Sequence, residues 1–507
     1  MRAFIVVAMK DRYDGSKKRS HKAALQALVQ CRYDRAVVES RGKSWHMTKR
    51  RRSLIARSLS RYLDLDRYIA FIRQKWFIAD KYQSFQQWTT RVLAGDAGDV
   101  SFTALQCLAA AYFAHMHGKP KAVVIQGTAL YGKALVQLRQ RIEDPRTAYD
   151  ATNVAAAIAL HLYELVTCTN EIGQLQHAGG VGRLIEVRGP ATFKRSPDHE
   201  YFLAARLQII YDAGIHRKRC FLAKEEWKTI PFTSTRASRS LLTRLVDIWV
   251  DVPEYYAEQR EIDEDISAGL DTSARQSALV KRMATSLQAL IRWRRDWETK
   301  NDGVAFEVPV DPRTSLTLDA HGRPLYPTVL YFHNAESANE ILLYNALLPV
   351  LRGIGGIVYG AQTLALAFES LEAGEVSDTR DSEEKKPLAL PRKDQPYLEP
   401  VREICRCVDY HLLQEARTPG ALGLMVPLRH CFLALCAQNM VEEAQFLIRI
   451  FRVLANSTGL EVTRRLSALS QLGNRRPIEG NFSQKLSPGI VKLNEMARTN
   501  EVNSEPV

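Results

Sequence analysis

The chain is predicted to be all-α, with one large irregular antiparallel helical domain that follows a basic N-terminal arm. Apolar residues recur at three- and four-residue steps in one segment after another, which places them on one face of a helix in each segment. Gly and Pro residues interrupt the chain between these segments, as expected at helix ends. The sequence has no strict fixed-period repeat, which argues against a regular solenoid.

Residues 101–190 carry the clearest pattern and predict four consecutive helices. The first spans 101–116 and ends at Gly118. The second carries an apolar stripe made of Tyr131, Leu135, Leu138 and Ile142. The third and fourth stripes span 154–166 and 181–185. Because nothing between these segments resembles a strand, the four helices are expected to pack antiparallel.

The other segments predict further helices and two interruptions. A lead-in helix is predicted from about Leu54 to Trp76. Residues 301–334, which contain four prolines, predict an irregular connection or short strands. Residues 373–396 are acidic and predict a solvated linker; an acidic activation segment is the alternative, but the segment has no interleaved aromatic residues. Further helices are predicted at about 200–215, 241–249, 274–297, from 335 onward, 397–416, 421–437 and 440–456.

These elements divide the chain into three predicted regions. Residues 1–82 form the basic arm and lead-in helix, residues 85–472 the helical domain, and residues 473–507 a polar tail. Within the domain, Trp293 and Trp297 are four residues apart, which puts both indoles on one side of a helix and predicts a role in packing.

The charge of the chain is concentrated in the arm. Of 507 residues, 46% are hydrophobic and 25% are charged, as in a globular protein. The net charge is +14, and residues 1–82, with 21 Lys/Arg and 7 Asp/Glu, hold all of it. A basic arm on a neutral body indicates contact with nucleic acid or nuclear import, and a merely solvated arm is the alternative. The candidate residues for nuclear localisation and phosphate contact are Lys17, Lys18, Arg19, Lys49, Arg50, Arg51 and Arg52.

The cysteines and the hydropathy pattern predict no disulfide framework and no membrane span. Most of the eight cysteines lie inside apolar helical runs, as expected of buried reduced thiols in an intracellular protein. The apolar start, Ala3–Met9, runs directly into charged residues without a cleavage site, and we interpret it as neither signal peptide nor anchor. No run reaches the roughly 20 apolar residues of a membrane-spanning helix.

Candidate catalytic and metal-binding patterns are incomplete. Gly127–Ala134 approaches a phosphate-binding loop, but it has Ala where the magnesium-binding Ser or Thr is required, and no strand precedes it. The Gly179–Gly182 cluster has only part of a dinucleotide fingerprint and predicts close helix packing. The cysteine and histidine spacings, at Cys405, Cys407, Cys431, Cys436, His115 and His117, do not match a tetrahedral zinc site.

One further histidine, His177, is predicted to be structural, because no acid or nucleophile accompanies it in sequence. Together these patterns predict no enzyme, no metal and no cofactor.

Several short motifs resemble the fungal-specific transcription factor regulatory domain. The resemblance covers roughly residues 85–472, and the order and spacing of its motifs carry it. The motifs are Tyr131-Gly-Lys-Ala-Leu135, Leu162-Tyr-Glu164, His177-x-x-Gly180, Arg188-Gly-Pro190, Phe221–Pro231, Trp293–Trp297, Leu343-Tyr-Asn345 and Ile404–His411. Two features depart from the family pattern: Gln174 stands where the family usually has Trp, and the six-cysteine zinc cluster that reads DNA is missing.

The resemblance implies a nuclear fungal transcriptional regulator of a metabolic or biosynthetic gene set. The implied partners are a second copy or other transcription factors, together with a small-molecule effector. Without a zinc cluster, DNA contact would come from the basic arm, weakly and without sequence preference, or from a DNA-binding partner. A six-cysteine reading frame upstream of Met1 would restore the cluster; otherwise it has been lost. The alternative function is a cytoplasmic helical scaffold that binds other proteins.

Overall fold

The fold is all-α, as predicted. The computed structural model describes residues 65–76, 83–95, 99–169, 173–233, 239–354, 356–372, 386–393, 398–413, 417–438 and 440–464. In these ranges helices follow one another almost without interruption, and the only strands are β1 (Ala305–Pro309) and β2 (Thr328–Phe332). Residues 373–385 of the predicted linker and the predicted tail lie outside the described ranges.

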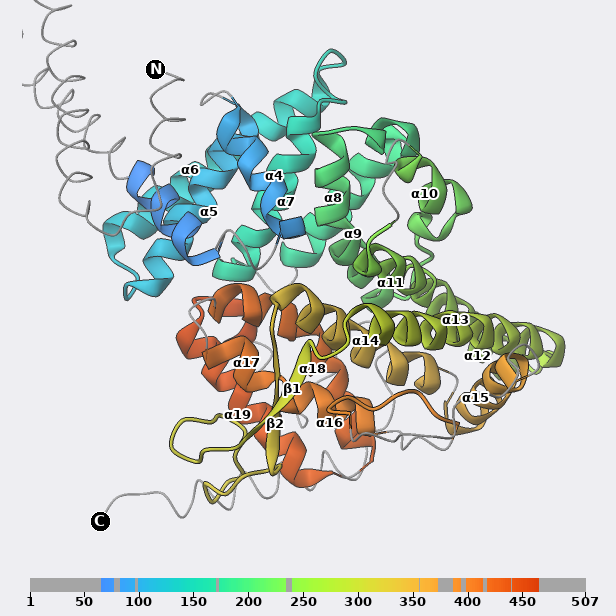
Figure 1. The fold of residues 1–507 in the computed structure, drawn as a ribbon. Helices are drawn as coiled ribbons and strands as arrows, with labels where there is room; N and C mark the ends of the chain where they lie inside the picture. Colours follow the sequence, from blue (N-terminus) through green and yellow to red (C-terminus); the bar gives the residue numbers. More distant parts are fainter. Residues whose placement is uncertain are drawn as a thin grey trace, which may run out of the picture. The chain divides into compact units, whose positions relative to one another are not determined.

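The four helices predicted at residues 101–190 are present as α5 (Val100–Met116), α6 (Lys121–Glu143), α7 (Ala151–Thr167) and α8 (Gly173–Arg188). They lie side by side, with α5 packed against both α6 and α7, and α7 against α8 (Figure 1). Most residues of α5 and α7 are buried, and many of these are alanines. Small side chains let neighbouring helices approach closely on every side, so α5 and α7 form the centre of this group.

The residues before α5 belong to the same hydrophobic core. Residues 65–76 are helical, and they bury Tyr68, Ile72 and Trp76. The ring of Tyr68 lies 4.7 Å from that of Phe113, and the ring of Trp76 lies 5.0 Å from that of Tyr112. The described part of the predicted lead-in helix is therefore fixed on the outside of α5. Helix α4 (Gln83–Ala94) follows it and packs against α9.

The next segment combines predicted helices with helices that the sequence analysis did not identify. Helices α9 (Asp198–Ile215), α11 (Leu241–Trp249) and α13 (Ser273–Lys300) agree with the expected positions. The helices not foreseen are α10 (Glu225–Thr229) and α12 (Val252–Ser267), and short 3₁₀ turns occur at Pro190–Lys194, Phe221–Ala223 and Ile230–Phe232. Most side chains of α12 are polar or charged, so its apolar stripe is short and escapes a periodicity argument.

Residues 301–334 contain a two-stranded antiparallel hairpin, in agreement with the expected short strands. Ala305 pairs with Phe332, and Pro309 pairs with Thr328. The long loop between the strands is fastened to the domain by Asp409, whose buried carboxylate accepts hydrogen bonds from Ser315 Oγ (2.5 Å), Leu316 N (2.9 Å) and Thr317 Oγ1 (3.1 Å).

The C-terminal helices pack around α14 (Ala335–Gly353), which is buried along most of its length. Helix α14 contacts α15 (Gly356–Glu372), which follows it directly, and also α16 (Glu399–Arg406) and α18 (Arg417–Ala437), which lie further along the chain (Figure 1). Helices α17 (Val408–Leu413) and α19 (Val441–Ser457) pack against α18. The prediction of a single helix at 397–416 is wrong in one respect. Two helices, α16 and α17, are present, and Cys407 separates them.

The predicted apolar stripe of α6 is also wrong in part. The residues that α6 buries are Gly127, Ala134 and Leu138, whereas Leu135 and Ile142 are exposed. A Cβ at Gly127 would lie only 3.5 Å from the backbone nitrogen of Ala111 on α5. Two small residues thus define the face that packs closely on α5, and this face is rotated away from the larger aliphatic residues.

The predicted packing roles of the tryptophans and cysteines are confirmed. Trp293 donates from Nε1 to the Leu241 carbonyl (2.8 Å), and Trp297 donates from Nε1 to Glu340 Oε2 (2.9 Å); both indoles are buried. The seven cysteines in the described ranges are buried, and burial raises the pKa of the Cys436 thiol to about 11. Among the described helices, none combines the length and the apolar character needed to cross a membrane.

Candidate functional site

Three side chains from three helices meet in a hydrogen-bonded cluster, which we call the Tyr131 cluster. The Tyr131 hydroxyl of α6 lies 2.8 Å from Glu164 Oε1 of α7 and 2.9 Å from His177 Nε2 of α8. Thr169, just after α7, completes the cluster: its backbone N–H donates to Glu164 Oε2 (3.0 Å) and its hydroxyl donates to Oε1 (2.7 Å). The cluster therefore ties together helices that follow one another in the chain.

The end of α7 explains how Glu164 is accommodated. Its side chain is fully buried, and a buried carboxylate needs hydrogen-bond donors. Cys168, the residue that ends α7, has a left-handed backbone conformation (φ 45°). This turn brings Thr169 back over the last turn of the helix, where it supplies two donors. With Tyr131 as the third, the carboxylate has the partners that its burial requires.

The proton positions in the Tyr131 cluster follow from the partners. A tyrosine hydroxyl has one proton to donate, and the carboxylate of Glu164 accepts it. The imidazole must then donate from Nε2 to the tyrosine oxygen. Burial lowers the pKa of His177 and raises the pKa of Tyr131, so both groups are held neutral near pH 7.

The Tyr131 cluster is a hydrogen-bonded chain of side chains, and no activated nucleophile lies beside it among the described residues. The nearby Cys107 thiol is fully buried, donates to the Ala104 carbonyl (3.0 Å), and has its pKa raised by burial. A neutral buried thiol is a poor nucleophile. The geometry therefore favours a structural clamp, in line with the role expected of His177. No acid accompanies this histidine in sequence, but in the folded domain Glu164 shares its hydroxyl partner, Tyr131.

Other motif residues occupy joints between elements. Gly189 has φ 72°, and the chain turns there into the 3₁₀ segment that starts at Pro190. The preceding Arg188 pairs with Asp198 (2.6 Å) and lies over the ring of Phe193, 5.2 Å from its centroid. Only glycine adopts such a positive φ without strain. This requirement explains why glycine stands at the centre of the Arg-Gly-Pro motif.

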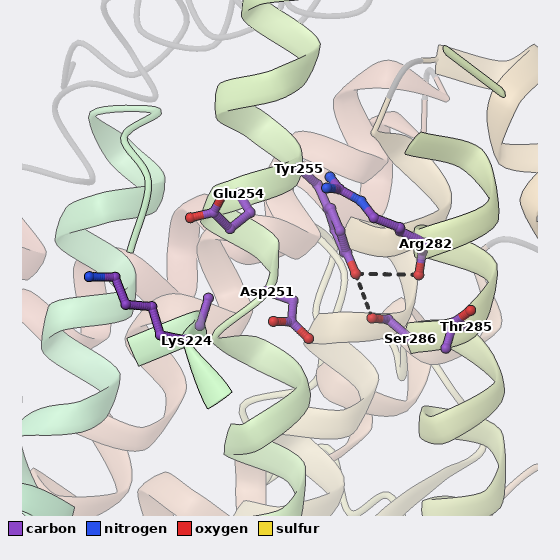
Figure 2. Close-up of a pocket in the computed structure, with 8 residues that line it drawn as sticks. Lys224, Asp251, Glu254, Tyr255, Arg282, Thr285 and Ser286 are labelled. Atoms are coloured by element: carbon purple, nitrogen blue, oxygen red, sulfur yellow. Dashed lines mark hydrogen bonds between the residues drawn. The ribbon is translucent and has the colours of Figure 1, made fainter. Parts of the chain in front are cut away.

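A second candidate site is an open pocket of about 490 Å³ between α12, α13 and the segment before α10 (Figure 2). The residues that line it are Ala223, Lys224, Asp251, Glu254, Tyr255, Arg282, Thr285 and Ser286. The Tyr255 hydroxyl lies 2.7 Å from Ser286 Oγ and 3.3 Å from the Arg282 carbonyl, which fixes the wall between α12 and α13 (Figure 2).

Most charges around this pocket already have partners. Lys228 donates to Asp251 (2.6 Å), and Arg219 donates to Glu254 (2.9 Å). Arg282 pairs with Glu258 of α12. Burial raises the pKa of Asp251, although Lys228 counteracts this effect. The charged and hydroxyl-bearing side chains of its walls can hydrogen-bond a small polar molecule.

The phosphate-binding and metal-binding patterns do not form sites in the described structure. Gly127–Ala134 lies in the middle of α6, so it is a helix and not a phosphate-binding loop. Gly182 faces α9, where an added Cβ would lie 3.6 Å from Ile209, as expected for a glycine in helix packing. Within the described ranges, no group of three or more His, Cys, Asp or Glu side chains is placed to hold a metal ion.

The seven basic residues predicted for nuclear localisation and phosphate contact, at 17–19 and 49–52, lie outside the described residues. The structure instead brings together Tyr131, Glu164 and His177, of which only His177 had been considered as a site residue. The motifs that hold the other two were visible in the sequence. Their convergence depends on how three helices pack, which no local pattern encodes.

Comparison with known proteins gives one partial match. No protein-family model matches the chain, and no solved structure matches it. An uncharacterized protein of Emericella nidulans is 27% identical over 127 residues. The matched part covers 25% of this chain and 27% of the relative, so the two are similar over about a quarter of their lengths.

Proposed function

We propose that the chain is a fungal transcriptional regulator that acts on a metabolic or biosynthetic gene set through its helical domain. The observation that supports this proposal best is the convergence of three motifs that resemble the fungal-specific transcription factor regulatory domain. Tyr131, Glu164 and His177 belong to three separate motifs, and one hydroxyl joins them at 2.8 and 2.9 Å. The three motifs therefore share one structural role in the domain.

Motifs further along the chain also have structural roles. The ring of Trp227 lies 4.8 Å from that of Phe221 and is buried. Asn345 donates from Nδ2 to the buried Glu403 (2.8 Å). Such roles agree with one helical domain in which the motif residues hold neighbouring elements together, and the partial match to a fungal protein agrees with a fungal family.

The proposal excludes catalysis as the function of the domain. Among the described residues, the Tyr131 cluster has no activated nucleophile, and Asp251, Glu254 and Arg282 of the pocket are each paired with a charged residue beside it. The pocket instead supports the proposed small-molecule effector, because its polar walls can bind a small metabolite. The proposed regulator contacts DNA through the basic arm or through a DNA-binding partner.

A tethered reporter assay tests the proposal. The full chain is fused to a heterologous DNA-binding domain, and transcription is measured from a reporter that carries the matching sites. We expect a change in reporter transcription, relative to the DNA-binding domain alone, that is lost in the Glu164→Ala variant. Immunoblotting and circular dichroism of the variant separate loss of regulation from loss of protein. No change with the intact chain would contradict the proposal.

Localisation separates the proposed regulator from the scaffold alternative. A fluorescent fusion of the full chain should be nuclear, and changing Lys49, Arg50, Arg51 and Arg52 to Ala should shift it towards the cytoplasm. The matched control changes Arg217, Lys218 and Arg219, a basic run inside the folded domain, to Ala. A fusion that is cytoplasmic with and without the arm substitutions would favour the scaffold.

A further inference from the structure

The open pocket in Figure 2 has two opposite charges on its walls that do not pair with each other. Asp251, the residue before α12, accepts a hydrogen bond from Lys228 (2.6 Å). Arg282 of α13 pairs instead with Glu258 of α12. Burial raises the pKa of Asp251, and the charges of Lys228 and Arg282 both counteract this effect. Arg282 therefore lies close to Asp251 without forming an ion pair with it, and the pocket keeps a gap between a carboxylate and a guanidinium.

One side of this gap accepts hydrogen bonds. Lys228 contacts only Oδ1 of the Asp251 side chain, which is 25% exposed, and the described residues give Oδ2 no hydrogen bond. Tyr255 donates its single proton to the Arg282 carbonyl (3.3 Å), so Ser286 Oγ must donate in the 2.7 Å contact and keeps its lone pairs available. In Figure 2 the carboxylate of Asp251 points toward the Ser286 hydroxyl. An ammonium group, which only donates hydrogen bonds, matches these two acceptors.

The other side of the gap donates hydrogen bonds. The Arg282 guanidinium lies over the ring of Tyr255, 5.5 Å from its centroid, and uses only Nη2 for its pair with Glu258. Within the described ranges, its Nε and Nη1 groups have no hydrogen-bond partner. Lys224, an exposed lining residue just before α10, forms no ion pair with any described residue. Both side chains can therefore donate charge-assisted hydrogen bonds to a carboxylate.

We propose that this pocket binds a free α-amino acid as a zwitterion, with its ammonium on Asp251 and Ser286 and its carboxylate on Arg282 and Lys224. An α-amino acid carries its two charges on one carbon, so they are as close together as the two charges of the pocket. A dicarboxylate would place a second negative charge beside Asp251, and a diamine would place a second positive charge beside Arg282. Like charges at such close range disfavour both of these ligand classes.

The volume of the pocket, about 490 Å³, lies within the range of small-molecule sites and leaves room for the side chain of the amino acid. The inference deepens the proposed function, on which the regulatory role of the bound amino acid rests. The binding step itself requires neither DNA nor transcription, so it can be measured on the purified full chain.

Ligand-detected NMR of the purified full chain at neutral pH tests the ligand class, because it reports weak as well as tight binding. The probes are all the standard amino acids in pools, together with succinate as the dicarboxylate and putrescine as the diamine. We expect one amino acid or a few related ones to bind, and neither succinate nor putrescine to do so. Isothermal titration calorimetry then gives the affinity of the tightest amino acid.

Derivatives of that amino acid test the two charges on the original chain, so this comparison stands even if a variant folds poorly. The N-acetyl derivative lacks the ammonium and the primary amide lacks the carboxylate. Each should bind at least about 10-fold more weakly, because each loses hydrogen bonds between charged groups.

Matched variants test the residues. Asp251→Asn and Arg282→Gln should each weaken binding of the amino acid at least about 10-fold. The controls Asp263→Asn and Arg292→Gln, at exposed positions of α12 and α13, should leave it unchanged. Asp251→Asn should not weaken the N-acetyl derivative further, because the ammonium that Asp251 would contact is already absent.

Three results would overturn the inference: no binding by any standard amino acid, tighter binding of succinate or putrescine, or equal binding of the N-acetyl derivative. None of them involves the tethered reporter, so each would leave the proposed regulatory function standing. A bound amino acid together with a silent reporter would support the site and contradict only the proposed function.

Discussion

Replacing Glu340 by Gln is expected to stabilise the protein at neutral and alkaline pH. Glu340 lies on α14 with 3% of its surface exposed, and its Oε2 accepts the Trp297 indole N–H at 2.9 Å. Burial raises the pKa of Glu340 from 4.5 to about 7; the hydrogen bond from Trp297 opposes this shift and the charge of Glu336 adds to it. A glutamine oxygen can still accept the indole hydrogen, but it never has to carry a buried charge.

The sign and size of the effect follow from linkage. A carboxyl whose pKa is higher in the folded state contributes full stability below the unfolded pKa, and this contribution is lost as the pH rises through the folded pKa. For Glu340 the loss falls between about pH 4.5 and pH 7. A shift of this size corresponds to about 3 kcal/mol. Glu340→Gln should therefore match the original chain near pH 4 and exceed its stability by up to about 3 kcal/mol at pH 8.

Urea denaturation at several pH values between 4 and 8 measures this difference, because urea leaves the ionic strength unchanged. Two controls frame the result. Glu340→Ala removes the acceptor as well as the charge, so near pH 4 it should destabilise by about 1–3 kcal/mol, because the buried indole N–H loses its partner. At pH 8 this loss should be offset, because the original chain then carries the cost of the buried charge. Glu226→Gln, on an exposed position of α10, should change little. A difference for Glu340→Gln that stays constant with pH, or a loss of stability at pH 8, would refute the reasoning.

The remaining predictions concern the Tyr131 cluster, the hairpin loop and the arm. Glu164→Ala should lower the free energy of unfolding by about 3 kcal/mol, measured by urea denaturation, because three donors lose a buried acceptor. Asp409→Ala should release the loop between β1 and β2, so limited proteolysis should cut within residues 310–327 faster than in the original chain. Binding to two unrelated DNA duplexes should be equally weak, with a slope of log K against log salt of about −4 to −5 if about five arm cations reach phosphates. Deleting residues 1–53 should abolish that binding, and a salt-resistant preference for one duplex would contradict the prediction.

The helices were predictable where their apolar residues are large and regularly spaced. Helices α5, α7 and α13 fulfil this condition, and each follows its predicted position closely. Helix α12 does not fulfil it, because much of its surface consists of carboxylates, which pair with cations such as Arg275 and Arg282. Such residues give no regular spacing of apolar side chains. Periodicity reports which face of a helix can be buried. It does not report which polar side chains will find a partner.

The face of a helix that is buried was harder to predict than the helix itself. On α6 the sequence favours Leu135 and Ile142 as core residues, but the structure buries Gly127 and Ala134 and exposes both larger residues. Close packing depends on the shape of the neighbouring helix, here α5, as well as on hydrophobicity. The same limit applies to the Tyr131 cluster, because Tyr131 and Glu164 are more than thirty residues apart along the chain.

The most direct test of the proposed regulatory function is chromatin occupancy of the chain in its own cells. The full chain, tagged at its natural locus, is immunoprecipitated with chromatin, and transcripts are compared between the original strain and a deletion strain. We expect enrichment at the promoters of a limited set of metabolic or biosynthetic genes whose transcripts change on deletion. If the tagged chain is abundant, yet no promoter is enriched and no gene set changes, the chain is not a transcriptional regulator.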